Sequence, residues 1–350
     1  MKIQKRVVEC LFSALIAVCF STGFFTTVAG AAELLIGTST VSITPDRPVS
    51  LTGQFHTRIA RTVESACTAT AVALESREGD KVLDQAIMVS CDLLAIRGGI
   101  DDMFRKKMAA RQPDFDVKKV FFNATHTHTG PTMIEGNYDI PKDIMQPREY
   151  VDFLTDRLCD MVIDAWESRQ PGGVSWGLGH AVLGRNRRVV YADGTAKMHG
   201  HTHVNNFRRI EGCEDHGVEV LFFWDKHKKL IAMAVNVACP SQRVGGRSAV
   251  NADFWHEARR DLRKLYGKDL CVLAWTGAAG DQVPHLQWRE KAEERMRERR
   301  GLTWLDELAQ RVVRAVGDAH EVAKSDIHYD VPLVHVAKQI KLPARIVTDK

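Results

Sequence analysis

The sequence predicts an α/β fold of the mixed α+β kind, in which mixed β-sheets are flanked by layers of helices. Segments with alternating apolar residues, which are typical of strands, recur along the chain between segments whose apolar residues have helical spacing. Some of the strands follow one another as a hairpin, and others are separated by a helix. Because both kinds of connection occur, we expect parallel and antiparallel neighbours in the sheets.

The first half of the chain alternates strands with two helices. A loop rich in Pro and Gly is expected at 48–53. Strands are predicted at 34–37, 67–74, 85–93 and 120–124, and helices at 100–110 and 148–169. The second helix carries an apolar stripe that we assign to the core: Tyr150, Leu154, Leu158, Met161, Val162 and Ala165.

The second half contains a predicted hairpin, because strands at 217–224 and 230–237 are separated by a short polar turn. Further strands are predicted at 174–183, 270–275 and 331–336, and helices at 254–266, from about 290, and at 303–324. Residues 340–350 resemble a strand followed by a helix start that Thr348 would cap. No linker interrupts 33–325, so we expect one domain.

Residues 1–32 are predicted to be a signal peptide. Lys2, Lys5 and Arg6 precede a long apolar stretch, and Ala29-Gly30-Ala31 supplies the small residues of a cleavage site after Ala31 or Ala32. A retained membrane anchor is the alternative. We expect the mature chain to be exported, either periplasmic or extracellular, with no later transmembrane segment.

Charge and cysteine content exclude some classes of protein. The formal net charge of +4 is too small, and the basic residues too mixed with acidic ones, to indicate a nucleic-acid partner. The cysteines after residue 32 are scattered, which does not fit a framework of disulfides, although an oxidising compartment permits individual bridges.

Residues 121–131 (FFNATHTHTGP) carry the most informative pattern. A β-prone run leads to His126 and His128, and Gly130-Pro131 ends it. Side chains two residues apart on a strand point to the same face, so both imidazoles can meet one metal ion or substrate at the strand end. The alternative is a pair of polar residues that cap the strand.

Several strings, in order, resemble the N-terminal catalytic region of neutral/alkaline non-lysosomal ceramidases and their bacterial relatives. The most specific of them is Ala124-Thr125-His126-Thr127-His128-Thr129-Gly130-Pro131. The others are Ile43-Thr44-Pro45 with Gly53, Phe55-His56, Arg185-Asn186-Arg187, Val235-Asn236-Val237-Ala238-Cys239, Ala252-Asp253 and Gly280-Asp281-Gln282-Val283-Pro284. The resemblance covers 33 to about 350.

This resemblance implies a zinc-dependent hydrolase of an amide-linked, N-acyl sphingoid-like substrate. It implies that His126 binds zinc, that His128 contacts the scissile amide, and that Arg187 holds the amide oxygen through its fixed guanidinium donors. Zinc would lower the pKa of a bound water and polarise the carbonyl. Asp281, in a turn after a buried strand, is a further catalytic candidate, and its alternative is a simple cap.

The chain departs from the family pattern at other ligand positions. A second histidine ligand is expected near Ala238, where the chain has Cys239 and Gln242 instead; Cys239 is our candidate for the second metal ligand. Gly277 stands where the family has its serine before Gly280-Asp281. The family's later ligands fall beyond residue 350, so we expect 33–350 to be a catalytic-type domain without its C-terminal portion.

Three hypotheses follow from these residues. The first is an exported ceramidase-like zinc hydrolase, and the second is a metal-free binding protein on the same fold. The third is a metal-dependent barrel of repeated strand–helix units, against which the predicted hairpin argues. His199, His201 and His203 form a further cluster on a polar loop, which we interpret as solvated rather than metal-binding.

Overall fold

A computed structural model describes residues 32–344 apart from residue 98. Residues 1–31 of the predicted signal peptide and the predicted cap Thr348 lie outside the described residues. Within them, the main feature is one eight-stranded sheet with the order β14-β13-β12-β7-β1-β4-β5-β6. Its strands are β1 (Glu33–Ser42), β4 (Thr68–Glu78), β5 (Lys81–Cys91), β6 (Val120–Ala124), β7 (Gln170–His180), β12 (Gly217–Asp225), β13 (Leu230–Val237) and β14 (Cys271–Thr276).

The sheet is mixed, as predicted. Strands β5 and β6 are parallel, as are β13 and β14, and all other neighbours are antiparallel. The predicted hairpin is formed by β12 and β13. This antiparallel pairing is incompatible with a barrel of repeated strand–helix units.

The sheet is folded over so that its two halves face each other. Its two edge strands, β6 and β14, are in contact, and Ser90 Oγ on β5 donates a 2.6 Å hydrogen bond to the carbonyl of Ala274 on β14. An apolar cluster fills the space between the halves and includes Val72, Leu74, Phe223 and Leu273. Because the strands are buried on both faces, their alternate residues belong to different clusters.

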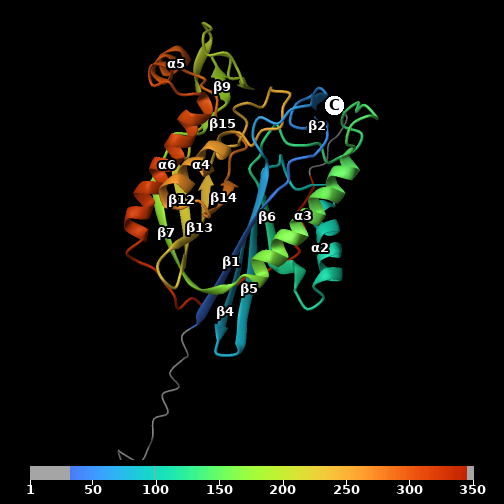
Figure 1. The fold of residues 1–350 in the computed structure, drawn as a ribbon. Helices are drawn as coiled ribbons and strands as arrows, with labels where there is room; N and C mark the ends of the chain where they lie inside the picture. Colours follow the sequence, from blue (N-terminus) through green and yellow to red (C-terminus); the bar gives the residue numbers. More distant parts are fainter. Residues whose placement is uncertain (1–31, 98, 345–350) are drawn as a thin grey trace, which may run out of the picture. The chain divides into compact units, whose positions relative to one another are not determined.

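Helices cover the two outer faces of this folded sheet (Figure 1). Helices α2 (Ile100–Arg111) and α3 (Pro147–Glu167) cover the half with β1, β4, β5 and β6. Helices α4 (Phe254–Tyr266) and α6 (Trp304–Ala323) cover the other half. The resulting order is helix, sheet, sheet, helix, which confirms the predicted layered class. The predicted apolar stripe of α3 is buried, as expected.

Helix α6 approaches β7 unusually closely because β7 has glycines at the contact. A Cβ atom on Gly179 would lie 2.1 Å from the carbonyl oxygen of Ala315, and one on Gly177 would lie 2.9 Å from that of Ala319. Ala315 and Ala319 are one helical turn apart and therefore share one face of α6. Small residues on both elements thus set the distance between this helix and the sheet.

Smaller elements lie on the loops. The pairs are β2 (Val49–Leu51) with β3 (Arg58–Ala60) and β8 (Arg185–Asn186) with β15 (Gln282–Val283), and a three-stranded sheet contains β10 (Ala196–Met198), β9 (Arg188–Tyr191) and β11 (Phe207–Ile210). The 3-10 turn η1 (Val117–Lys119) and helix α5 (Glu290–Arg299) complete the described elements. The loop predicted at 48–53 is therefore partly a strand.

The prediction of a strand at 331–336 is wrong. It has no strand ladder: the N–H of Val331 makes a single backbone bond, to the carbonyl of Ala32 (2.9 Å), Pro332 lacks an N–H, and later N–H groups bond to side chains. The N–H of Leu333 donates to Ser76 Oγ (3.1 Å), and that of His335 donates to an oxygen of Asp84 (2.6 Å). Residues 340–344 also form no strand.

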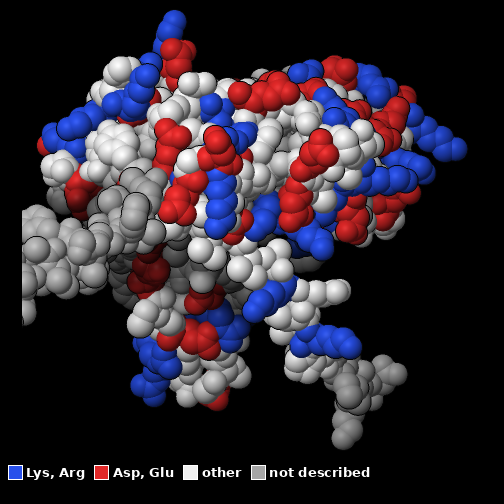
Figure 2. All heavy atoms as spheres, turned by 90° about the horizontal axis from the view of Figure 1, so that it is seen from below, with Lys and Arg blue, Asp and Glu red and all other residues white. Residues whose placement is uncertain are grey.

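Three surface and composition predictions can be compared with the described part of the chain. The cysteines there are all free, and only Cys213 is exposed. No helix in this part is long and apolar enough to cross a membrane. Figure 2 shows basic and acidic side chains interspersed on the face that it presents.

Candidate functional site

The candidate site forms where the ends of three strands meet. The N–H of Thr276, at the end of β14, donates to Asn123 Oδ1 on β6 (3.2 Å), and its hydroxyl donates to the carbonyl of Thr125 (3.1 Å). The same carbonyl accepts a bond from the N–H of Ser241 in the loop after β13 (3.0 Å). The loops at 125–131, 238–253 and 277–285 are thereby held together.

The structure brings His126 and His128 together, but not by the strand geometry that the sequence predicted. Strand β6 ends at Ala124, and His126 has a left-handed backbone with φ of 62°. The two imidazole centroids are nevertheless 5.0 Å apart. A left-handed non-glycine residue costs about 1–3 kcal/mol and is found mainly where the surrounding structure enforces it, often at functional sites.

The threonines of this segment explain why the histidines face the site. Thr125, Thr127 and Thr129 are fully buried. The hydroxyls of Thr127 and Thr129 both donate to the carbonyl of Asn251, at 2.9 and 2.7 Å. Because the threonines anchor one side of the segment to the 238–253 loop, the intervening histidines point the other way.

One ring nitrogen of His126 is hydrogen-bonded, and no described hydrogen bond involves the other. Its Nδ1 lies 2.9 Å from the carbonyl oxygen of Leu94, which accepts a bond only if Nδ1 carries the proton. This arrangement leaves a lone pair on Nε2, as in metal-binding histidines. Burial, together with Arg97 and Arg187, lowers the pKa of His126, so the ring is neutral at pH 7.

His128 is held between two glycines. A Cβ atom on Gly53 would lie 2.6 Å from the His128 ring, and one on Gly245 would lie 2.9 Å from His128 Cβ. Nε2 of His128 is buried and has no hydrogen-bond partner among the described residues. Burial, followed by the neighbouring His126, lowers the pKa of His128 to about 4. An unpartnered, neutral nitrogen is available to a substrate.

Replacing Gly53 by alanine is expected to displace the His128 ring. Gly53 has φ of 97°, so part of the loss in stability will be backbone strain of about 1 kcal/mol. Gly79→Ala is the matched control, because Gly79 has φ of 60° but no heavy atom would lie within 4 Å of a Cβ atom there. Urea unfolding should show a larger loss for Gly53→Ala, and NMR should show His128 ring shifts only there. Equal losses with unchanged ring shifts would contradict this packing.

Arg187 and Asp281 belong to the same site but have different surroundings. Arg187 Nη2 donates to the carbonyl of Gly280 (2.7 Å), and its Nε is buried with no hydrogen-bond partner among the residues that the structure describes. Its charge acts on both His126 and His128. The Asp281 carboxylate accepts a bond from Asn186 Nδ2 (2.7 Å), and its carbonyl accepts one from the N–H of Arg187 (2.8 Å). Asp281 therefore positions the segment that carries Arg187.

Two residues near the site were not singled out as part of it by the sequence. His199 is exposed, as expected for a solvated loop, but its Nε2 lies 3.5 Å from Arg187 Nη1, and partial burial and Arg187 lower its pKa. Its left-handed backbone, with φ of 53°, resembles that of His126. Arg97 acts on His126 from the loop after β5. No sequence pattern identifies either residue, because each comes from a separate loop.

Cys239, the candidate second ligand, lies elsewhere. It continues the face of β13 that carries Val235 and Val237 and packs in the cluster beneath α4 and α6. Burial strongly raises the pKa of its thiol, which disfavours the thiolate that binds metal. Across residues 32–344, residue 98 apart, no group of three or more His, Cys, Asp or Glu side chains is arranged to hold a metal ion.

Asp253 fixes the loop behind His128. It is fully buried at the start of α4, and its two carboxylate oxygens accept hydrogen bonds from the N–H groups of Val244 (2.8 Å) and Phe254 (2.9 Å). Burial raises the pKa of Asp253 to about 6, although these donors act in the opposite direction. Folding therefore takes up a proton at this side chain at mildly acidic pH.

The raised pKa of Asp253 predicts a pH dependence of stability. Between about pH 4 and pH 6 the folded chain holds this proton more tightly than the unfolded chain, so this contribution to stability is present at low pH and is lost as pH rises. The loss should amount to about 1.4 kcal/mol per unit of pKa shift. Urea unfolding of the natural protein and Asp253→Asn across this range measures it. If the difference in free energy of unfolding between the natural protein and Asp253→Asn does not change with pH, the assignment is contradicted.

Comparisons with known proteins were made by sequence and by structure. No protein-family model matches the chain, and no curated protein sequence matches it. Solved structures do match, and two of them are ceramidases. A neutral ceramidase from Pseudomonas aeruginosa has a TM-score of 0.65 at 17% identity, and a ceramidase complexed with C2 has a TM-score of 0.61 at 15% identity.

The chain has a ceramidase-like fold. Each match covers 85% of this chain, and the chain spans about half of each ceramidase, 46% and 45%. The resemblance predicted from the sequence is thus confirmed at the level of the fold. At such low identity the likeness to ceramidases does not by itself transfer an activity to this chain.

Proposed function

We propose that the chain carries the site of an exported, ceramidase-like hydrolase that cleaves an amide in an N-acyl, lipid-like substrate. The observation that carries the proposal is the convergence of His126, His128 and Arg187 on one side of the joined strand ends. The ceramidase-like fold supports the reaction class. Export rests on the predicted signal peptide alone.

The proposed roles follow from the surroundings of each side chain. Arg187 would hold the amide oxygen, because a guanidinium beside a partly water-excluded site stabilises developing negative charge. Its bond to Gly280 fixes its direction. His128 would contact the amide through its unpartnered Nε2, exchanging a proton as a neutral imidazole. Asp281 would keep Arg187 in place through Asn186 and the backbone.

A zinc ion is implied by the resemblance, and the described residues fit it only in part. His126 offers one suitable ligand, since its Nδ1 is anchored and its Nε2 is free. A catalytic zinc site needs about three protein ligands, and the described residues do not group three. We therefore assign His126 as the metal-facing residue and derive no catalytic step through zinc.

An apolar cavity supports a substrate with a hydrocarbon part. It has a volume of about 590 Å³, and Trp176, Leu178 and Trp275 contribute to its lining. Trp275 directly precedes Thr276, whose hydroxyl bonds to the carbonyl beside His126. A chain lying in this cavity would start within a short distance of the proposed site.

Hydrolysis of a ceramide with a fluorescent acyl group tests this proposal. The purified protein should release the acyl group in the presence of Zn²⁺, and Arg187→Ala should reduce kcat by about 10²–10³-fold. His126→Ala should abolish both turnover and zinc binding. His201→Ala is the control, because His201 is an exposed histidine of the neighbouring loop. Absence of turnover with zinc bound, or full activity of His126→Ala, would contradict the proposal.

A metal-free binding protein on the same fold is the second candidate. It is favoured by the position of Cys239, which points into the apolar core where a second ligand was expected. In this case the purified protein would bind the acylated substrate with unchanged affinity when zinc is removed, and would not cleave it.

A further inference from the structure

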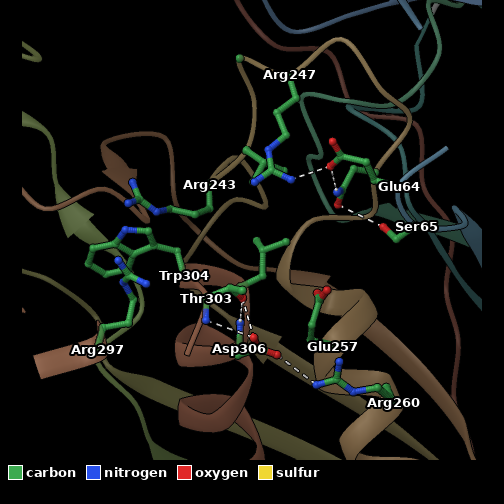
Figure 3. Close-up of a pocket in the computed structure, with 14 residues that line it drawn as sticks. Glu64, Ser65, Arg243, Arg247, Glu257, Arg260, Arg297, Thr303, Trp304 and Asp306 are labelled. Carbon is green, nitrogen blue, oxygen red and sulfur yellow. Dashed lines mark hydrogen bonds and ion pairs between the residues drawn. The ribbon is translucent and has the colours of Figure 1, made fainter. Parts of the chain in front are cut away.

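A second, polar cavity is lined in part by the 238–253 loop (Figure 3). Its volume is about 870 Å³, within the range of small-molecule sites. Its walls come from the loop before β4, the 238–253 loop, α4, α5 and the first turn of α6. His126, His128 and Arg187 do not line it, so it is separate from the candidate hydrolase site.

Charged side chains dominate this cavity, and only some of them neutralise one another. Four arginines face three carboxylates: Arg243, Arg247, Arg260 and Arg297 against Glu64, Glu257 and Asp306. Arg247 pairs with Glu64 at 2.5 Å, and Arg260 pairs with Asp306 at 3.2 Å. Arg243, Arg297 and Glu257 remain without a close ionic partner inside the cavity.

Arg243 and Arg297 form a cationic corner with Trp304. Their guanidinium carbons lie 4.2 and 4.8 Å from the centre of the Trp304 ring, and Figure 3 shows the three side chains gathered at one end of the cavity. The nearest carboxylates of Arg297 are two side chains of its own helix, both at 3.7 Å. Arg243 bonds to Nδ1 of His285 and has no ion pair in the described part of the chain.

The stacked tryptophan holds both guanidinium groups in place, and burial lowers the pKa of Arg243. Arg297 Nη1 donates to the carbonyl of Leu302 (2.5 Å), while its buried Nε has no hydrogen-bond partner among the described residues. A partly buried guanidinium whose donors are not all used favours an anionic group. Contact with the indole ring adds a cation–π attraction that keeps the corner formed without a ligand.

Glu257 supplies the complementary polar group. One of its carboxylate oxygens is buried and has no hydrogen-bond partner in the described structure, and burial raises the pKa of this side chain. A buried acceptor without a donor is destabilising, and a ligand hydroxyl would supply the missing hydrogen bond.

We propose that this cavity binds a small polyhydroxylated anion, such as a sugar acid or a sugar phosphate. Its acidic group would lie between Arg243 and Arg297 beside Trp304, and a hydroxyl would donate to Glu257. This inference does not depend on the proposed hydrolase function, since it involves other residues and no metal.

Calorimetric titration with glucuronate, glucose 6-phosphate and glucose tests the site. At least one of the two anions should bind with a dissociation constant below about 1 mM, and neutral glucose should not bind measurably. The comparison of carboxylate with phosphate identifies the preferred acidic group. Arg243→Gln should weaken binding by about tenfold or more. Arg209→Gln is the control, because it removes the same charge from an exposed strand.

Two further variants keep the test decisive if Arg243→Gln fails to fold. Arg297→Gln should weaken the binding of the anion, and Glu257→Gln should weaken it through the hydroxyl contact. Thermal unfolding of each variant shows whether it is folded. Binding of glucose as tight as that of the anions, absence of heat with both anions, or unchanged affinity in the folded variants would overturn the proposal.

Discussion

Replacing Asp92 by alanine is expected to lower the free energy of unfolding by about 3–5 kcal/mol. Asp92, at the end of β5, accepts two hydrogen bonds from Arg259 of α4, at 2.7 and 3.0 Å. The side chains of Asp92 and Arg259 are 0% and 4% exposed. The pair joins the two halves of the sheet. Removing the carboxylate leaves the buried guanidinium without its counter-charge.

Matched substitutions separate the buried pair from ordinary surface pairs. Asp156 forms an exposed ion pair with Lys107 at 2.8 Å, so Asp156→Ala should cost no more than about 1 kcal/mol. Replacing Asp92 by leucine together with Arg259 by methionine should recover part of the loss, because no charge is then left unpaired. Chemical denaturation measures all of these variants. A loss for Asp92→Ala as small as that of Asp156→Ala would contradict the assigned role of the pair.

Replacing Arg58 by methionine is expected to cost about 3–5 kcal/mol, because a charged hydrogen bond contributes about 1.5–3 kcal/mol and several are lost together. The Arg58 guanidinium is buried and donates to the carbonyls of Thr52, His128 and Arg247, each at 2.6 Å. These carbonyls belong to three loops. The substitution should therefore also displace the His128 segment.

Arg61→Met is the control for Arg58, because Arg61 is a nearby exposed arginine. It should change stability by less than about 0.5 kcal/mol. Denaturation gives the stability of both variants, and NMR of the histidine rings reports the position of His128. An Arg58→Met protein with unchanged stability and unchanged His128 signals would show that this guanidinium does not hold the loops.

Much of the fold is predictable because its elements have strong local patterns. The helix at 254–266 and the strands at 120–124 and 230–237 have the predicted bounds. The apolar stripe of α3 identified its buried face. The folding-over of the sheet was not predictable, because it depends on contacts between β6 and β14, which are distant in sequence.

The sequence pattern selected His126 and His128 as candidates but did not predict their geometry. Their rings approach each other through a left-handed loop residue and anchoring threonines. Cys239 was chosen because the resemblance places a ligand near Ala238, and the period of two along β13 turns its thiol into the core. His199 and Arg97 reach the site through tertiary contacts that no local pattern encodes.

Anomalous diffraction at the zinc edge from crystals soaked in Zn²⁺ tests the central claim most directly. The claim is that His126 Nε2 faces the space shared with His128 and Arg187. We expect an anomalous peak about 2.0–2.1 Å from His126 Nε2, which is the usual distance for a zinc–histidine bond. A peak found only at the exposed His201 and His203, with none beside His126, would contradict it.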